Sequence, residues 1–193
     1  MAFNWGAVVR PKEGQRVSGD IYLVEALSVS GLLVAVIDGL GGGEEARRAA
    51  LAAAEIIHAH PETEINELMR QSHLALHGTR GAVMALMTLD RATRRVAYVG
   101  VGNIGAQVYS REPIKPISKN GILGYRFPNL LKLSYSYNFG DTFVLYSDGI
   151  SSRFGLESRL NLALEPQPFA ESILAQYGKL NDDATVVVVR DIE

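Results

Sequence analysis

Residues 32–46, LLVAVIDGLGGGEEA, decide the fold class of this chain. The run at 32–37 is apolar on both faces, which is typical of a strand covered on both sides. Asp38 ends this run, three glycines follow at 41–43, and an alanine-rich stretch with high helix propensity begins at Glu44. The stretch therefore predicts a buried strand, a glycine-rich turn that carries an acid, and then a helix.

Further strands are expected on both sides of this stretch. Segments rich in Val, Ile, Leu and aromatic residues predict strands at 3–10, 21–29, 82–89, 96–101, 106–109 and 184–189, and a hairpin of 131–137 with 142–146. Helices are expected at 44–60, from Pro61 to His77, and from Pro168 to Gly178, whereas 111–130 reads as irregular. The order lacks a βαβ alternation, so it predicts an α+β domain of antiparallel sheets with helices packed outside.

Composition excludes several classes of protein. The 193 residues suit one domain, and 19 basic against 21 acidic residues give a net charge of −2, without the basic excess of a nucleic-acid or lipid binder. Cysteine is absent, which excludes disulfides, thiolate metal sites and a cysteine nucleophile. The N-terminus does not resemble a signal peptide, and no apolar run approaches the ~20 residues of a membrane span. We therefore expect a cytoplasmic protein that binds neither membrane nor nucleic acid.

Four aspartates, Asp20, Asp38, Asp148 and Asp182, lie at the edges of strongly apolar strand segments, and three of them adjoin glycine. An acid at the end of a buried strand needs a compensating cap, arginine or metal ion. Any single Asp-Gly pair is more often a hairpin turn. Asp38 argues against a turn, because glycines and a helix follow it. Together the four acids would suit Mg²⁺ or Mn²⁺, which prefer hard oxygen ligands.

These residues resemble the type 2C metal-dependent protein phosphatases, in their SpoIIE-like branch. VIDGLGGGEEA is similar to the family's Asp-Gly-x-Gly-x-Gly segment, and VSGDIYLVEAL to its first metal motif. GAVMALMTLD and VAYVGVGNIGAQVY resemble the central strands, FVLYSDGI the third aspartate motif, and NDDATVVVV the last. Five motifs in the family's order cover almost the whole chain.

The resemblance implies a four-layer α-β-β-α sandwich, two antiparallel sheets flanked by helices, as one phosphatase domain over residues 1–193. It implies two Mn²⁺ or Mg²⁺ ions, with Asp38 bridging them, the Gly39 carbonyl and Asp20 on one ion, and Asp148 and Asp182 on the other. The expected reaction is attack of metal-activated water on phosphoserine or phosphothreonine. The expected partners are phosphorylated STAS-domain stressosome proteins, with the chain acting as a monomeric negative regulator of sigma-B stress signalling.

The chain also departs from the family pattern. Leu40 stands where many members carry a histidine proposed as general acid, and Gly19 stands where an acid often accompanies the first aspartate. Arg80-Gly81 replaces a frequent pair of threonines. A phosphate-binding arginine is expected near the first strand, where Arg10 and Arg16 are both candidates.

Several other features favour structural interpretations. GVGNIGA at 100–106 matches a dinucleotide fingerprint, but a strand follows it, so we interpret it as a glycine-rich hairpin. His73 and His77 lack a third ligand and are expected on the surface. Asp141 is expected in a turn, and Asp183 is either a spare ligand or a solvated neighbour. A non-catalytic metal-binding regulatory module remains the alternative to an enzyme, and a two-metal nuclease is a weaker one.

Overall fold

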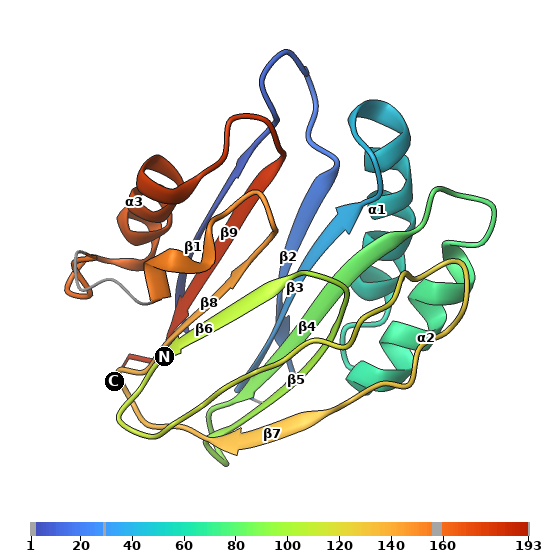
Figure 1. The fold of residues 1–193 in the computed structure, drawn as a ribbon. Coiled ribbons are helices and arrows are strands. Elements are labelled where there is room, and N and C mark those ends of the chain that lie inside the picture. Colours follow the sequence, from blue (N-terminus) through green and yellow to red (C-terminus); the bar gives the residue numbers. More distant parts are fainter. Residues whose placement is uncertain (1–2, 29, 156–159, 193) are drawn as a thin grey trace.

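A computed structural model describes residues 3–28, 30–155 and 160–192. These residues form two stacked antiparallel sheets with helices on both outer sides (Figure 1). One sheet has the order β1 (Asn4–Arg10), β9 (Ala184–Arg190), β8 (Thr142–Tyr146), β6 (Gly105–Tyr109). The other has the order β2 (Asp20–Leu27), β3 (Gly31–Gly39), β4 (Ala82–Asp90), β5 (Arg95–Val101), β7 (Leu133–Ser136).

The helices complete four layers, as the resemblance implied. Helices α1 (Gly43–Ala59) and α2 (Ile65–Ala75) cover the five-stranded sheet, and α3 (Pro166–Tyr177) covers the four-stranded one, beside a short 3₁₀ helix at Ser152–Gly155 (Figure 1). None of the helices in the described ranges is both long and apolar enough to cross a membrane.

Strand β3 is buried on both faces, which confirms the prediction for its apolar run. Leu33, Ala35 and Ile37 pack under the helices, whereas Leu32, Val34 and Val36 pack into the space between the two sheets. The same alternation holds in β9, where Val187 and Val189 face the other sheet. Three buried clusters, one between each pair of layers, therefore hold the sandwich together.

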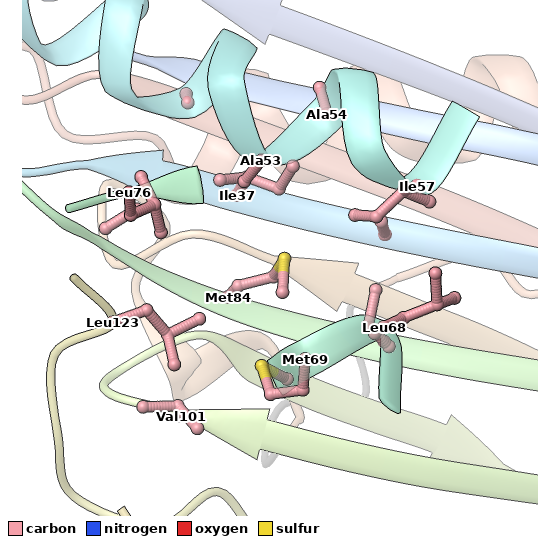
Figure 2. Packing of buried hydrophobic residues seen from close by; sticks show 14 of the residues in the cluster. Ile37, Ala53, Ala54, Ile57, Leu68, Met69, Leu76, Met84, Val101 and Leu123 are labelled. Atoms are coloured by element: carbon pink, nitrogen blue, oxygen red, sulfur yellow. The ribbon is translucent and has the colours of Figure 1, made fainter. Parts of the chain in front are cut away.

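Helix α1 packs close to the sheet through small residues. Its buried face consists of five alanines and Ile57, and Figure 2 shows Ala53, Ala54 and Ile57 above the sheet, with Leu68 and Met69 of α2 completing the cluster. Alanine adds little bulk, so the backbone of the helix can approach the strands. This close approach matters at the end of β3, where the candidate site begins.

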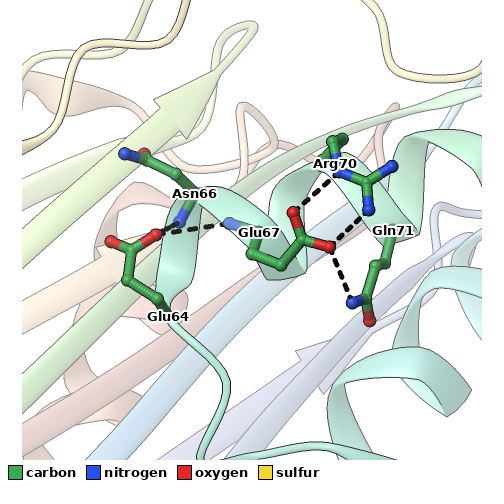
Figure 3. A network of polar contacts seen from close by, with 5 residues as sticks. All are labelled: Glu64, Asn66, Glu67, Arg70 and Gln71. Carbon is green, nitrogen blue, oxygen red and sulfur yellow. Dashed lines mark hydrogen bonds and ion pairs between the residues drawn. The ribbon is translucent and has the colours of Figure 1, made fainter.

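Helix α2 begins later than the sequence predicted. Glu64 acts as its N-cap and accepts hydrogen bonds from the backbone N–H groups of Asn66 at 2.8 Å and Glu67 at 3.3 Å (Figure 3). Arg70 Nε and Gln71 Nε2 donate to the Glu67 carboxylate at 2.7 and 2.9 Å, and these bonds hold the pKa of Glu67 down at about 2. The cap fixes the start at Ile65, so Pro61 lies in the preceding turn.

Two predicted hairpins, the one of 131–137 with 142–146 and the glycine-rich one at 100–106, are wrong for the same reason. Strand β7 pairs with β5, whereas β8 pairs with β6 and β9 in the opposite sheet. Strands β5 and β6, on either side of the glycine-rich segment 100–106, also lie in different sheets. In both places the chain crosses between layers instead of turning back within one. The segment 111–130 is irregular as expected, with isolated bridges only among its described residues.

Candidate metal centre

Asp20 and Asp38 lie directly opposite each other in the five-stranded sheet. Asp20 begins β2 and Asp38 is the penultimate residue of β3, and the antiparallel register pairs the two residues. Side chains of directly paired residues lie on the same face of a sheet. The register alone thus brings together two acids that are 18 positions apart in the sequence.

Asp148 and Asp182 lie at the matching end of the other sheet. Asp148 follows β8 and Asp182 precedes its antiparallel neighbour β9. The ends of these strands are joined because Ser147 N–H donates to the Thr185 carbonyl at 3.1 Å, while Thr185 N–H donates to Ser147 Oγ at 2.9 Å. The sandwich therefore brings an acidic pair from each sheet to one end.

Neither Asp-Gly pair is the type I′ turn of a tight hairpin, which would require a positive φ at Gly39 or Gly149. Asp38-Gly39 ends strand β3, whereas Asp148-Gly149 lies in a β-turn in which the Ile150 N–H donates to the Ser147 carbonyl at 3.0 Å. Glycine is needed at both positions because of close backbone approach. A Cβ on Gly39 would lie 1.9 Å from the Ala46 carbonyl oxygen of α1, and a Cβ on Gly149 would lie 1.9 Å from the Asp183 carbonyl oxygen. Each glycine thus places its aspartate against a neighbouring element.

The acids interact electrostatically. Burial raises the pKa of Asp38 to about 8, with further increases from the charges of Asp20, Asp148, Asp182 and Asp183. Burial also raises the pKa of Asp20 to about 7, although the hydroxyls of Ser147 and Thr185 oppose this rise. The pKa of Asp148 is raised as well, by burial and by Asp182. Several negative charges are therefore held together in a partly dehydrated site.

The residues present fit a divalent cation. Asp20 is only 2% exposed, and its Oδ2 has no hydrogen-bond partner among the described residues. Such a buried oxygen needs a partner, and carboxylates are the donors that Mg²⁺ and Mn²⁺ prefer. No group of three or more His, Asp or Glu side chains in the described ranges already forms a closed metal cage. The four acids therefore share one end of the sandwich without enclosing a common point.

Asp183 has a structural role. Its Oδ1 accepts the Lys12 N–H at 2.9 Å and its Oδ2 accepts the Gly19 N–H at 2.8 Å, so both oxygens are used by the β1–β2 loop. The side chain is 5% exposed. The interpretation of Asp183 as a solvated neighbour is wrong because the side chain is buried, whereas its role as a spare ligand stays a prediction.

Comparison with known proteins places the chain in a family. The family model described as stage II sporulation protein E (SpoIIE) matches residues 28–191. The chain belongs to the SpoIIE family. The family predicted from the five motifs is thereby confirmed.

Three relatives illustrate the similarity. "Phosphoserine phosphatase RsbX" of Bacillus subtilis (strain 168) is 23% identical over 92% of this chain and 89% of its own length. The crystal structure of RsbX in complex with magnesium has a TM-score of 0.84 at 22% identity, covering 95% of this chain and 92% of that one. A chain in "The bacterial stressosome: a modular system that has been adapted to control secondary messenger signaling" has a TM-score of 0.89 at 35% identity, covering 98% and 100%.

A further solved structure has the same fold. The PP2C phosphatase domain of SpoIIE from Bacillus subtilis has a TM-score of 0.81 at 22% identity, covering 98% of this chain and 63% of that one. Together with the RsbX structure, this likeness confirms the predicted sandwich of two antiparallel sheets flanked by helices.

The structure explains one departure from the SpoIIE family pattern. A side chain at Gly19 has little space, because its Cβ would lie 2.8 Å from the Cβ of Ala46 and 3.1 Å from Asp183 Oδ2. The alanine face of α1 and the Asp183 carboxylate therefore occupy the volume that an acid at this position would need. Leu40, a second departure, packs with its side chain against the core between the sheets.

Asn103 is a site residue that the sequence interpretation missed. Its Nδ2 donates to Asp148 Oδ2 at 2.5 Å and so lowers the pKa of Asp148 against the effect of burial. Asn103 lies in the segment that crosses from β5 to β6. The sequence did contain a signal for Asn103, because it is a polar residue in a glycine-rich connection at the end of a buried strand. The match of this segment to a nucleotide fingerprint drew attention away from it.

The two arginines considered as phosphate ligands, Arg10 and Arg16, differ in their surroundings, and the choice between them stays open. Arg10 donates through Nη2 to the Lys179 carbonyl at 2.6 Å, and Lys179 Nζ donates to the Asp148 carbonyl at 2.6 Å. Lys179 thus brings a positive charge close to Asp148 and lowers its pKa. Arg16 is exposed on the β1–β2 loop. Lys12, which was not considered, extends its Nζ to within 2.5 Å of the position that a Cβ of Gly42 would take.

The histidine pair is only partly at the surface, so the expectation for His73 was wrong. His73 is 6% exposed, and its Nδ1 accepts the Gly124 N–H at 3.1 Å while its Nε2 lies 3.2 Å from His77 Nε2. The Phe127 ring lies against it, with 5.0 Å between ring centroids. Burial lowers the pKa of His73. His73 therefore secures the 121–127 segment to α2.

Asp141 accepts the Asn138 N–H at 2.8 Å, as a turn residue does.

Proposed function

We propose that this chain is a phosphoserine/phosphothreonine protein phosphatase that depends on Mn²⁺ or Mg²⁺. The observation that carries the proposal is that Asp20 and Asp38 from one sheet lie at the same end of the sandwich as Asp148 and Asp182 from the other. Burial and neighbouring negative charges raise the pKa values of Asp20, Asp38 and Asp148 there. Membership of the SpoIIE family and the similarity to RsbX, a phosphoserine phosphatase, support it.

The proposed ligand set follows the position of each acid. Asp38 would bridge two ions, with Asp20 and the Gly39 carbonyl on one ion and Asp148 and Asp182 on the other. Two bound divalent ions supply charge stabilisation for the phosphoryl group and activate water. Asn103 would orient Asp148 through its 2.5 Å hydrogen bond, and Asp183 would hold the β1–β2 loop beside the site. Leu40 has no proton to give, so it cannot protonate the leaving oxygen.

The proposed substrates are phosphorylated regulatory proteins with STAS domains. The name of RsbX and the stressosome structure with 35% identity support this class of partner and a role as negative regulator of a stress-response pathway. The single phosphatase domain over 1–193, the monomeric state and the cytoplasmic location stay predictions.

Catalysis and metal dependence can be tested together. Purified protein with Mn²⁺ is expected to hydrolyse p-nitrophenyl phosphate and a phosphoserine or phosphothreonine protein. EDTA or Asp38→Asn is expected to abolish both activities, whereas Glu171→Gln, on the exposed surface of α3, is expected to retain them. Activity that survives Asp38→Asn would refute the assignment of this acid. Metal binding without turnover on any phosphorylated substrate would instead favour a non-catalytic module.

A further inference from the structure

Arg80 is a cation beside the site to which the proposed chemistry gives no role. It lies in the turn between α2 and β4, where the Gly81 carbonyl accepts the Leu40 N–H at 3.0 Å. Thr79 fixes this turn, because its Oγ1 accepts the Gly81 N–H at 3.0 Å and donates to the Leu76 carbonyl at 2.7 Å. The backbone next to Arg80 is therefore bonded to the segment that follows Asp38.

The side chain of Arg80 lies across the glycine segment. Its Nη1 is 2.6 Å from the position that a Cβ of Gly41 would occupy. Gly41 also has φ +101, a conformation that a residue with a Cβ rarely adopts. The absence of a side chain at 41 thus leaves space for the guanidinium, three residues beyond Asp38.

The guanidinium has no partner in the described residues. Arg80 is exposed, and no hydrogen bond or ion pair joins it to Asp38 or to any other acid in these ranges. On the next glycine, the Nζ of Lys12 lies 2.5 Å from the position of a Gly42 Cβ, so two cations lie along the rim of the site. A rim of this kind attracts anionic polypeptide.

We propose that Arg80 is a substrate-positioning residue that binds an acidic side chain next to the phosphorylated residue of the protein substrate. A planar guanidinium with free N–H groups matches a carboxylate in a bidentate manner. Its exposure and its place over Gly41 put it beside the aspartates instead of among them, so it contacts a flanking residue and not the reacting phosphate. The inference rests on the proposed phosphatase function and narrows its substrates to phosphoproteins with an acidic residue beside the phosphorylated one.

Matched peptides test this role. Three phosphoserine peptides that differ only in having Asp, Ala or Lys next to the phosphoserine are hydrolysed with Mn²⁺, and kcat/KM is measured for each. The wild type is expected to prefer the Asp peptide to the Ala peptide by about 2- to 5-fold, the upper part of the range for an exposed ion pair. Arg80→Ala is expected to bring this ratio to about 1, mainly through KM. Arg80→Lys should retain part of the preference, and Arg80→Glu should prefer the Lys peptide.

Arg111→Ala is the matched control, because this exposed arginine follows β6 at the end of the strand away from Asn103. It is expected to keep the wild-type ratio. An unchanged ratio in Arg80→Ala would overturn the inference, as would an equal loss on all three peptides, which would mean that Arg80 binds the phosphate itself or supports the fold.

A binding assay separates this inference from the proposed function. Fluorescence anisotropy measures the affinity of the same labelled peptides for Asp38→Asn, with and without Arg80→Ala. If the wild type hydrolyses no peptide but the Asp peptide still binds more tightly through Arg80, the phosphatase proposal fails and the role of Arg80 stands. If turnover is normal and Arg80→Ala leaves the preference intact in both assays, the role of Arg80 fails alone.

Discussion

The acids at the site should make the metal-free protein less stable as the pH rises, and Asp38→Asn should remove part of this loss. The carboxyl of Asp38 has a pKa of 3.8 in an unstructured chain and about 8 in the fold. Between these values the folded state holds a proton that the unfolded state has released. The free energy of unfolding therefore falls with rising pH, by about 1.4 kcal/mol per unit for one such group.

The magnitude follows from the two acids with the largest shifts. From pH 5 to pH 7, Asp38 alone contributes a fall of up to about 2.7 kcal/mol. Asp20, with a pKa of about 7, acts in the same direction. Because Asp20 itself helps to raise the pKa of Asp38, the two contributions are coupled. We expect a fall of about 4 kcal/mol in the wild type and about half of that in Asp38→Asn.

Urea unfolding in EDTA at pH 5, 6 and 7 measures this difference, with the fluorescence of Trp5, the one tryptophan of the chain, as the probe. Glu171→Gln should follow the wild type, since this side chain lies on the exposed surface of α3. Saturating Mn²⁺ at pH 7 should restore the lost stability, because an ion that binds only the folded state stabilises it. A pH dependence that is equal in Asp38→Asn and wild type, or stability that rises with pH, would refute the reasoning.

Three further changes test the framework around the acids. Gly39→Ala should lower the free energy of unfolding by about 3 kcal/mol or more, because the new Cβ would collide with the Ala46 carbonyl oxygen. The control Gly14→Ala has nothing within 4 Å of its Cβ and should lower it by about 1 kcal/mol. Thermal denaturation measures both changes. Asp183→Ala removes the acceptor of two backbone N–H groups and should lower the free energy of urea unfolding by about 2–4 kcal/mol; a loss below 1 kcal/mol would contradict its structural role. Asn103→Ala should raise the Mn²⁺ concentration for half-maximal activity by about 10-fold, with an unchanged value counting against its contact with Asp148.

The layered fold could be predicted because the chain shows two clear patterns: apolar runs that must be covered on both faces, and aspartates that interrupt such runs beside a turn. The apolar run before Asp38 and the valine run of β9 needed cover on both faces, and the structure covers both. The four aspartates could be selected because each interrupts an apolar strand beside a turn, and the fold brings them to one end of the sandwich.

The crossings between the sheets could not be predicted in the same way. An alternating pattern states that one face of a strand is buried, but both sheets bury their inner faces in the same core, so the pattern does not assign β7 or β8 to a sheet. Asn103 was missed because its role depends on such a crossing. His73 was misplaced because the segment that buries it, around Gly124, is irregular and has no periodicity to read.

The pairing of β1 with β9 has a consequence for biosynthesis. These strands come from opposite ends of the sequence, and Lys12 and Asp183, which bond beside them, are separated by 171 positions. During translation β1 must wait without its neighbour until β9 has left the ribosome, and contacts of such long range slow the folding of β proteins. Because Asp182 and Asp183 arrive with β9, the candidate metal centre cannot be assembled before this strand is made. A nascent chain that stops short of β9 thus lacks one of the proposed metal ligands, whatever else has already folded.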